Sequence, residues 1–290
     1  MTSAKPAART SGLRPWLGAA LAAVSPASAQ TSPPPVKLGM AESFAVLTAT
    51  DVLNAGPSVI SGDVGSAKWI VFGFPPGIVT DGTIQERGFP MAQGHDALSQ
   101  AYLDAAGRTP DASVGPQLGG LTLTPGVYRS GGNLELTGTL TLDAQGDPTA
   151  VFILQSADNV LSTSPGNTVA LVNEANPCNV FWQAGREAVL GTASEFAGTI
   201  LAMRRIWLGP GSRVQGRLLS LHDDVILNNN MINRPVRFTP KRGHLYPRFD
   251  GVGPKTVSRG LDQGVYVLLA VGHDRLSWRS DFRTLCWPGS

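Results

Sequence analysis

Short stretches of alternating apolar and polar residues recur along the chain. Residues 134–142 (LELTGTLTL) place their leucines on one face and Glu135 with three threonines on the other. Residues 121–124 (LTLT) alternate in the same way and stop at Pro125-Gly126, a strong turn pair. Residues 150–154 (AVFIL) are apolar throughout, which is typical of a strand buried on both faces. The pattern predicts many short strands joined by tight turns.

A repeat of eighteen residues is the clearest internal regularity. Val189-Leu190-Gly191 aligns with Trp207-Leu208-Gly209, and one more step leads to Val225-Ile226-Leu227. The other matched positions are Ser194 with Ser212, Phe196 with Val214, Gly198 with Gly216, and Ile200-Leu201 with Leu218-Leu219. This length is too short for a propeller blade or a helical hairpin, but it suits one coil of a β-solenoid. The sequence therefore predicts stacked β-coils with a continuous apolar core.

One segment, Met91 to Gly107, breaks the β pattern. Its apolar residues recur at helical spacing, with polar residues between them: Ala92, Leu98, Ala101, Tyr102 and Ala105 against Gln93, Asp96, Gln100 and Asp104. Gly107 stands where a helix-ending glycine is common. We expect a single amphipathic helix that covers an apolar sheet face.

Composition agrees with a β-rich globular body. Of 290 residues, 34 are Gly and 22 are Pro, 42% are apolar and only 15% are charged. A typical domain has about 25% charged residues. The balance excludes a disordered chain, a coiled coil and a long helical bundle.

The N-terminus has the features of a secretory leader. Lys5, Arg9 and Arg14 precede an apolar stretch, 16–24, and Ala27-Ser28-Ala29 follows as a small-residue cleavage site. The sequence predicts a signal peptide over 1–29, a Pro-rich linker over 30–35, and a secreted or cell-surface protein. The next most apolar stretch, 265–271, is far short of the ~20 residues that a bilayer requires.

Charge separates the body from a tail. Residues 30–233 hold ten Lys/Arg and seventeen Asp/Glu, whereas residues 234–290 hold ten Lys/Arg and four Asp. The tail has no echo of the repeat and no clear amphipathic period. We interpret residues 234–290 as a basic tail that is disordered or the product of a shifted reading frame. Of the two cysteines, Cys178 lies beside Val180 and Phe181, which favours a buried free thiol, although pairing with Cys286 stays open.

Several motifs together resemble the ice-binding-like family of microbial secreted proteins. They occur in the family's order between about residues 36 and 233: SGDVG (61–65), AYLDAAGRT (101–109), LTPGVY (123–128), VFILQ (151–155), NVFWQ (179–183) and LGTASEFAGTILA (190–202). The resemblance implies a mainly β fold, namely a discontinuous right-handed β-helix of triangular cross-section with one long flanking α-helix.

The resemblance also implies adsorption to ice through a flat face of short hydroxyl, amide and small side chains. A loose family motif is Thr, then Ala or Gly, any residue, then Thr or Asn. On this basis the candidate residues are Thr192, Ser194, Ser212, Asn228 and Asn230, with Thr137, Thr139 and Thr141 as secondary candidates. The sequence departs from the motif at Glu195 and Arg213, whose long charged side chains would disturb ordered water on that face. The expected partner is ice, bound by a monomer without cofactor, metal or catalysis.

Two other functions compete with ice binding. A structural or adhesive exoprotein with the same fold would bind cell-envelope or matrix carbohydrate, with Trp207, Arg213 and Arg217 as contacts. That alternative is favoured if Glu195 and Arg213 point onto the flat face. A polysaccharide-cleaving enzyme would use paired carboxylates or a base together with Ca²⁺.

The best cluster for such an enzyme, His222-Asp223-Asp224, is better explained as a solvated loop, and Asp63 as a turn residue. No nucleophile motif, phosphate loop or nucleic-acid motif occurs. We therefore expect no enzyme, no nucleic-acid partner and no transmembrane segment.

Overall fold

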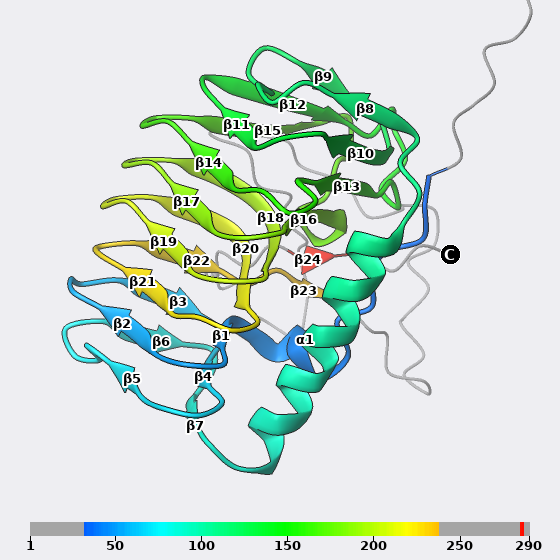
Figure 1. Ribbon diagram of the computed structural model, residues 1–290. Coiled ribbons are helices and arrows are strands. Elements are labelled where there is room, and N and C mark those ends of the chain that lie inside the picture. The colour runs from blue at the N-terminus through cyan, green and yellow to red at the C-terminus, as the bar shows by residue number, and fades with distance from the viewer. Residues whose placement is uncertain (1–31, 238–284, 287–290) are drawn as a thin grey trace, which may run out of the picture.

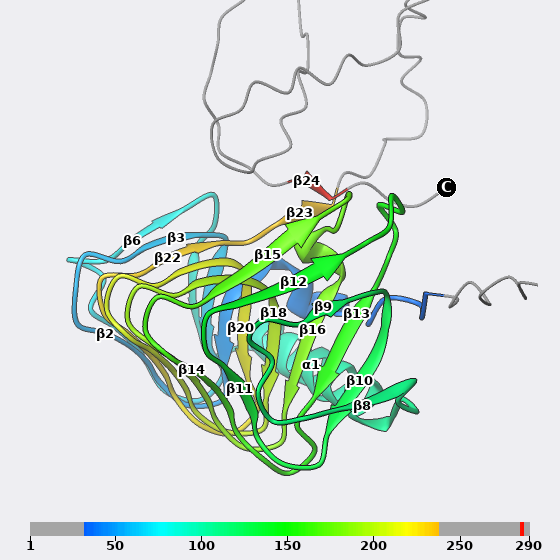
Figure 2. The same cartoon turned by 90° about the horizontal axis from the view of Figure 1, so that it is seen from above.

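The computed structural model describes residues 32–237 and 285–286, and these form a three-sided parallel β-helix with one helix along its length (Figure 1). The view along the coils in Figure 2 shows the three sides. The fold class predicted from the sequence, a mainly β helix of stacked coils with one flanking α-helix, is confirmed.

We name the sides I, II and III. Side I is a seven-stranded sheet formed by β11 (Leu134–Leu136), β14 (Leu161–Thr163), β17 (Ala188–Leu190), β19 (Ile206–Leu208), β21 (Val225–Leu227), β2 (Val52–Asn54) and β5 (Val71–Phe72). Sides II and III are the two halves of a second sheet, because β18 (Glu195–Ala202) and β20 (Arg213–Ser220) bend around the corner between them.

Side II consists of the first halves of β18 and β20 together with β9 (Thr122–Leu123), β12 (Thr139–Asp143), β15 (Thr168–Val172), β22 (Met231–Asn233), β3 (Val59–Ser61) and β6 (Ile78–Thr80). Side III consists of the second halves of β18 and β20 together with β8 (Ala112–Val114), β10 (Gly126–Ser130), β13 (Phe152–Gln155), β16 (Val180–Ala184), β1 (Phe44–Thr48), β4 (Asp63–Ser66) and β7 (Ile84–Glu86). Two 3-10 turns, Gly39–Ser43 and Pro177–Asn179, and the pair β23 (Val236–Arg237) with β24 (Leu285–Cys286) complete the described elements.

The strand register confirms most of the eighteen-residue repeat. Val189 pairs with Trp207, and Gly198 pairs with Gly216. The third coil is displaced by one residue from the predicted alignment, because Trp207 pairs with Ile226 instead of Val225. The turn before β21 has one residue more than the turn before β19, and the extra residue lengthens that coil.

The order of the coils along the axis is discontinuous in sequence. β1 lies between β4 and β20, and β3 lies between β6 and β22, so the first coils stack on the last ones. The helix α1 (Phe89–Gly107) carries the chain past the stack to the far end, from which the remaining coils return (Figure 1).

The helix covers side III through an apolar interface. Met91, Leu98 and Ala105 are buried against outward residues of the strands, including Leu201 and Leu219. The predicted helix is confirmed, but it begins two residues earlier. Ala92, expected on the apolar face, is exposed, and Met91 takes the buried position.

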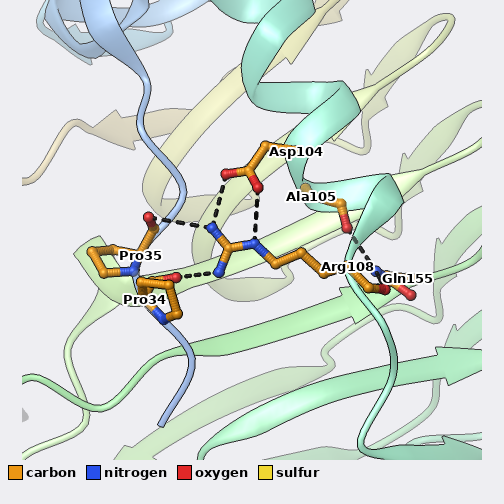
Figure 3. A network of polar contacts seen from close by, with 6 residues as sticks. All are labelled: Pro34, Pro35, Asp104, Ala105, Arg108 and Gln155. Atoms are coloured by element: carbon orange, nitrogen blue, oxygen red, sulfur yellow. Dashed lines mark hydrogen bonds and ion pairs between the residues drawn. The ribbon is translucent and has the colours of Figure 1, made fainter.

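The end of the helix is tied to the residues that precede the first coil (Figure 3). Arg108 pairs with Asp104 at 2.8 Å and donates hydrogen bonds to the backbone oxygens of Pro34 and Pro35. Ser32 accepts a hydrogen bond from the backbone N–H of Val151. The described part of the expected linker, 32–35, is therefore held against the β-helix.

Cys178 corrects one expectation. Its side chain is buried, but it is disulfide-bonded, so the predicted free thiol is wrong. The sequence holds one other cysteine, Cys286, which lies in β24. Sequence neighbours such as Val180 indicate burial, but they carry no information on a partner 108 positions away.

The expected signal peptide, 1–29, the apolar stretch 265–271 and most of the tail lie outside the described residues. Their assignments stay predictions. In the part of the chain that the structure describes, no helix is long and apolar enough to cross a bilayer.

Ala193 lies at a corner in the left-handed backbone region, with φ of 54°, where the equivalent Gly211 has φ of 75°. This conformation costs an alanine about 1–2 kcal/mol. We expect Ala193→Gly to raise the free energy of unfolding by about 0.5–1 kcal/mol, measured by urea unfolding. The matched control is Ala170→Gly in strand β15, which should lower it by a similar amount. A loss of stability in Ala193→Gly would contradict the assignment of strain to this corner.

Candidate functional site

The corners between sides I and II hold the residues that the family motif indicates. Ser194, Ser212 and Asn230 follow the last residue of each corner turn, and their side chains point inward, with exposed fractions of 0%, 0% and 3%. Buried side chains cannot touch an ice surface. The expectation that these three lie on an exposed face is therefore wrong.

Hydrogen bonds explain why these polar side chains are buried. Ser194 Oγ donates to the backbone oxygen of Gly191 at 2.6 Å, and Ser212 Oγ donates to the same oxygen at 2.8 Å. Asn230 Nδ2 donates to the backbone oxygen of Gly209 at 2.8 Å. The buried turn carbonyls need these donors, because an unpaired polar group inside the protein costs about 1–3 kcal/mol. The three side chains thus fix the corner from within.

Three other predicted residues are exposed at the edge of side I. Thr137 follows β11, Thr192 follows β17, and Asn228 follows β21. Since those strands belong to one sheet, these side chains lie along the same edge. We call this set, Thr137, Thr192 and Asn228, the corner ridge.

Side I itself presents a row of side chains of which the sequence singled out Trp207 alone as a candidate contact. The middle residue of each strand faces outward, and strand pairing places these residues in line: Glu135, Ser162, Val189, Trp207, Ile226, Leu53 and Phe72. We call this line the central row. With strands ~4.8 Å apart, its six steps extend about 29 Å. From Ser162 to Phe72 the row carries no charge.

The rows on either side of the central row differ in chemistry. Toward side III lies a charged line that includes Glu187, Arg205, Asp224 and Asp51, as the backbone hydrogen bonds between successive coils show. On the other flank the next outward row is uncharged and consists of the residues that follow each strand: Thr137, Ser164, Gly191, Gly209, Asn228 and Ala55. Two residues of the corner ridge therefore belong to this row, and Thr192 lies one residue beyond it.

Side II carries the other threonine candidates. Thr139 pairs with Thr168, and Thr141 pairs with both Thr122 and Ala170. Thr139 is exposed and Thr141 half-buried. Thr139 and Thr141 therefore lie on a different side of the β-helix from Thr192 and Asn228.

The two residues that interrupt the motif also face outward on side II. Glu195 pairs with Arg213 across adjacent strands, and Arg213 Nε lies 3.5 Å from Glu195 Oε1. Partial burial raises the pKa of Glu195, while the Arg213 guanidinium acts in the opposite direction. Because the strands carry this ion pair on side II, it does not interrupt the central row of side I.

The remaining candidates for chemistry have structural roles. Arg217 is buried and donates hydrogen bonds to the backbone oxygens of Glu42 and Pro235, so the suggestion that it contacts a carbohydrate is wrong. Asp224 Oδ1 accepts a hydrogen bond from Thr50 Oγ1 at 2.6 Å. Asp63 is the first residue of strand β4, and its Oδ1 accepts two hydrogen bonds from Thr83 on the neighbouring coil. It therefore ties two coils together, and the expected local turn role is wrong.

No group of three or more His, Cys, Asp or Glu residues in the described chain is arranged to hold a metal ion. In the described residues the helix covers one of the three sides, and another side bears an uncharged row in register. Such a parallel β-helix defines a solenoid protein that presents an extended binding surface. The chain belongs to the ice-binding-like family, which matches residues 46–233.

Relatives of known name agree with this assignment. The chain is 39% identical over 216 residues to an ice-binding protein of Nostoc, covering 73% of this chain and 79% of the relative. It is 32% identical to ice-binding protein 1 of Shewanella frigidimarina, covering 68% of this chain but only 26% of that longer protein.

Solved structures give the same result. The crystal structure of an ice-binding protein from the Antarctic ascomycete Antarctomyces psychrotrophicus has a TM-score of 0.66 and 33% identity, covering 68% of this chain and 97% of that one. An ice-binding protein from an Arctic yeast, described for its antifreeze activity, has a TM-score of 0.65 and 27% identity, covering 73% and 98%.

Proposed function

We propose that this protein binds ice and that it does so through side I. The observation that carries the choice of side is the central row, in which five consecutive apolar side chains, from Val189 to Phe72, lie in register without an intervening charge. Membership of the family supports ice as the ligand.

The physical basis is the regularity of parallel strands. Because backbone hydrogen bonds fix neighbouring strands ~4.7–4.9 Å apart, outward side chains form a rigid array. Apolar groups in such an array do not hydrogen-bond to water, while the corner ridge of Thr137, Thr192 and Asn228 supplies hydroxyl and amide groups along its edge. An ordered water layer on this surface can merge with ice. Adsorption of this kind involves no catalysis, cofactor or metal.

The proposal includes export. The predicted leader, 1–29, would deliver the folded domain outside the cell, where an ice-binding surface meets extracellular ice.

Ile226→Lys tests side I, because it introduces a mobile charged chain at the centre of the row. We expect the protein concentration needed to inhibit ice recrystallisation to rise at least about tenfold, equivalent to ~1.4 kcal/mol of binding. The control is Gln215→Lys, which adds the same side chain at an exposed position of side II. Equal effects of the two variants would contradict the assignment of the ice-binding surface to side I. A wild type that does not inhibit recrystallisation would contradict ice binding itself.

Thr192→Tyr in the same assay separates the ridge from the row. The tyrosine adds bulk at the edge of side I without adding charge, so a loss of activity would assign Thr192 to the ice-binding surface. Full activity would restrict that surface to the central row.

Trp207 favours a second candidate function, adhesion to carbohydrate. Its ring lies in the middle of side I and is 37% exposed beside the small residue Gly209. A flat aromatic ring can stack on the apolar face of a sugar, as Trp does at many interfaces. Retention of the wild type on insoluble polysaccharide, and its loss in Trp207→Ala, would support this function.

A further inference from the structure

The two ends of the β-helix are closed to different extents. At the end formed by β8, β9 and β11, residues 116–121 lie across the last coil through backbone hydrogen bonds to Glu135, Thr139 and Thr141. The inward side chains Leu118 and Leu134 are consequently fully buried. This end has its own cap.

The opposite end, formed by β5, β6 and β7, leaves core positions open. Ile84 pairs with Val64, yet Val64 is fully buried while Ile84 is 43% exposed. Val71 and Val79 are also only partly buried, although they pair with the buried Val52 and Ile60. A terminal coil of a solenoid normally needs a cap or a polar outer surface.

Exposed apolar side chains concentrate at the same end. Of the nine large hydrophobic side chains that are exposed in the described chain, five lie between residues 69 and 84: Trp69, Ile70, Phe72, Ile78 and Ile84. In addition, β5, β6 and β7 each pair with a described strand on one side only, which leaves backbone groups along β6 and β7 available for another strand. On the two-residue strand β5, the backbone N–H of Val71 is already bound by the Glu86 carboxylate.

The charges around this end are segregated between two corners. Lys68 and Arg87 lie at the corner between sides III and I, where Arg87 Nε donates to the backbone oxygen of Lys68. Glu86 is also there, but its carboxylate accepts a hydrogen bond from the backbone N–H of Val71 at 2.6 Å. Asp81 lies at the corner between sides II and III. The segregation holds for the terminal coil alone, because one coil further in each corner carries an aspartate, Asp51 at the first and Asp63 at the second.

We propose that two copies of this chain associate end to end through the coil formed by β5, β6 and β7. A two-fold axis that passes through the middle of β7 and the corner between sides I and II exchanges those two sides. β7 then pairs with β7 of the other copy, and β5 with β6, all antiparallel. The same axis brings Lys68 and Arg87 of each copy onto Asp81 of the other.

Charge complementarity and edge pairing favour a second copy of this chain as the partner that covers the open end. One symmetric contact covers the open core, places the three strand edges against one another and matches the basic corner with the acidic one, as a self-complementary two-fold interface requires. The proposal replaces the monomer expected from the sequence, since patterning along a chain does not reveal whether the end of a solenoid is capped. The contact is independent of ice, and it leaves the central row of each copy exposed.

The test is the mass of the full chain by light scattering after size-exclusion chromatography over a hundredfold range of concentration. We expect a concentration-dependent dimer that Ile84→Lys converts to a monomer. Leu103→Lys changes an equally apolar residue that is exposed on the helix, and it should leave the dimer intact. A wild type that is monomeric at all concentrations would overturn the proposal.

A charge exchange keeps the proposal testable if Ile84→Lys does not fold. Lys68→Glu places like charges opposite Asp81 and should raise the dimer dissociation constant about tenfold, whereas Lys68→Glu combined with Asp81→Lys should restore it. Failure of the combined variant to recover the dimer would contradict the two-fold arrangement. A monomeric wild type in which Ile84→Lys lowers the melting temperature would show instead that the chain itself covers this end.

Discussion

Gly216→Ala is expected to lower the free energy of unfolding by about 3 kcal/mol or more. A β-carbon at this position would lie 1.8 Å from the backbone oxygen of Gly198 and 2.6 Å from its carbonyl carbon. These two glycines are paired on adjacent strands at the bend between sides II and III, so neither backbone can retreat without breaking the ladder. Because a typical domain is stable by only 5–15 kcal/mol, urea unfolding should show a clearly lower midpoint.

Gly131→Ala is the matched control. Its added β-carbon would meet no atom within 4 Å, and the backbone there is not in the left-handed region. We expect a change within about 0.5 kcal/mol. Equal destabilisation by the two substitutions would mean that loss of glycine flexibility, and not contact with Gly198, causes the effect at Gly216.

The stacked coils could be predicted from the sequence because each coil requires the same residue types at the same positions. Inward positions such as Phe196 and Val214 must be apolar, and Gly198 and Gly216 must leave room for one another, so the pattern recurs wherever coils have equal length. The displacement at Ile226 was missed because one extra turn residue alters the register without altering the apolar pattern.

The orientation of the corner residues could not be predicted in the same way. In an extended strand, residues two apart point to the same side, so Thr192 and Ser194 were expected to share a face. Ala193, in the left-handed conformation, turns the chain from side I to side II between them, which leaves Thr192 exposed and Ser194 pointing inward. A hydroxyl side chain suits either environment, and its residue type therefore does not indicate which one it occupies.

The central row was missed for the opposite reason. Val225-Ile226-Leu227 has the composition of a fully buried strand, yet its middle residue faces outward. Sequence patterning identifies exposed positions by their polarity. A surface that is apolar by function is therefore indistinguishable from core until the direction of each strand is known.

Gln155→Leu is expected to destabilise the contact between the helix and side III by about 3 kcal/mol. Gln155 is fully buried, and its Nε2 donates to the backbone oxygens of Ala105 at 2.6 Å and Arg108 at 3.0 Å. Its Oε1 accepts a hydrogen bond from Arg129 Nε at 2.8 Å. The last carbonyls of a helix have no partner within the helix, so these donors satisfy groups that burial would otherwise leave unpaired.

Leucine has nearly the size of glutamine but forms no hydrogen bond. Gln155→Leu therefore measures what the hydrogen bonds of Gln155 contribute to stability, separately from its packing. A buried group that loses its partner costs about 1–3 kcal/mol. The hydrogen bond to Ala105 is buried, whereas those with Arg108 and Arg129 are partly buried and contribute less. Amide hydrogen exchange should accelerate in the last turn of α1, around Asp104 and Ala105, more than in the strands. The control, Gln215→Leu on exposed side II, should change neither stability nor exchange there. Uniform acceleration throughout the β-helix would show that Gln155 supports the core as a whole, and not the docking of the helix end.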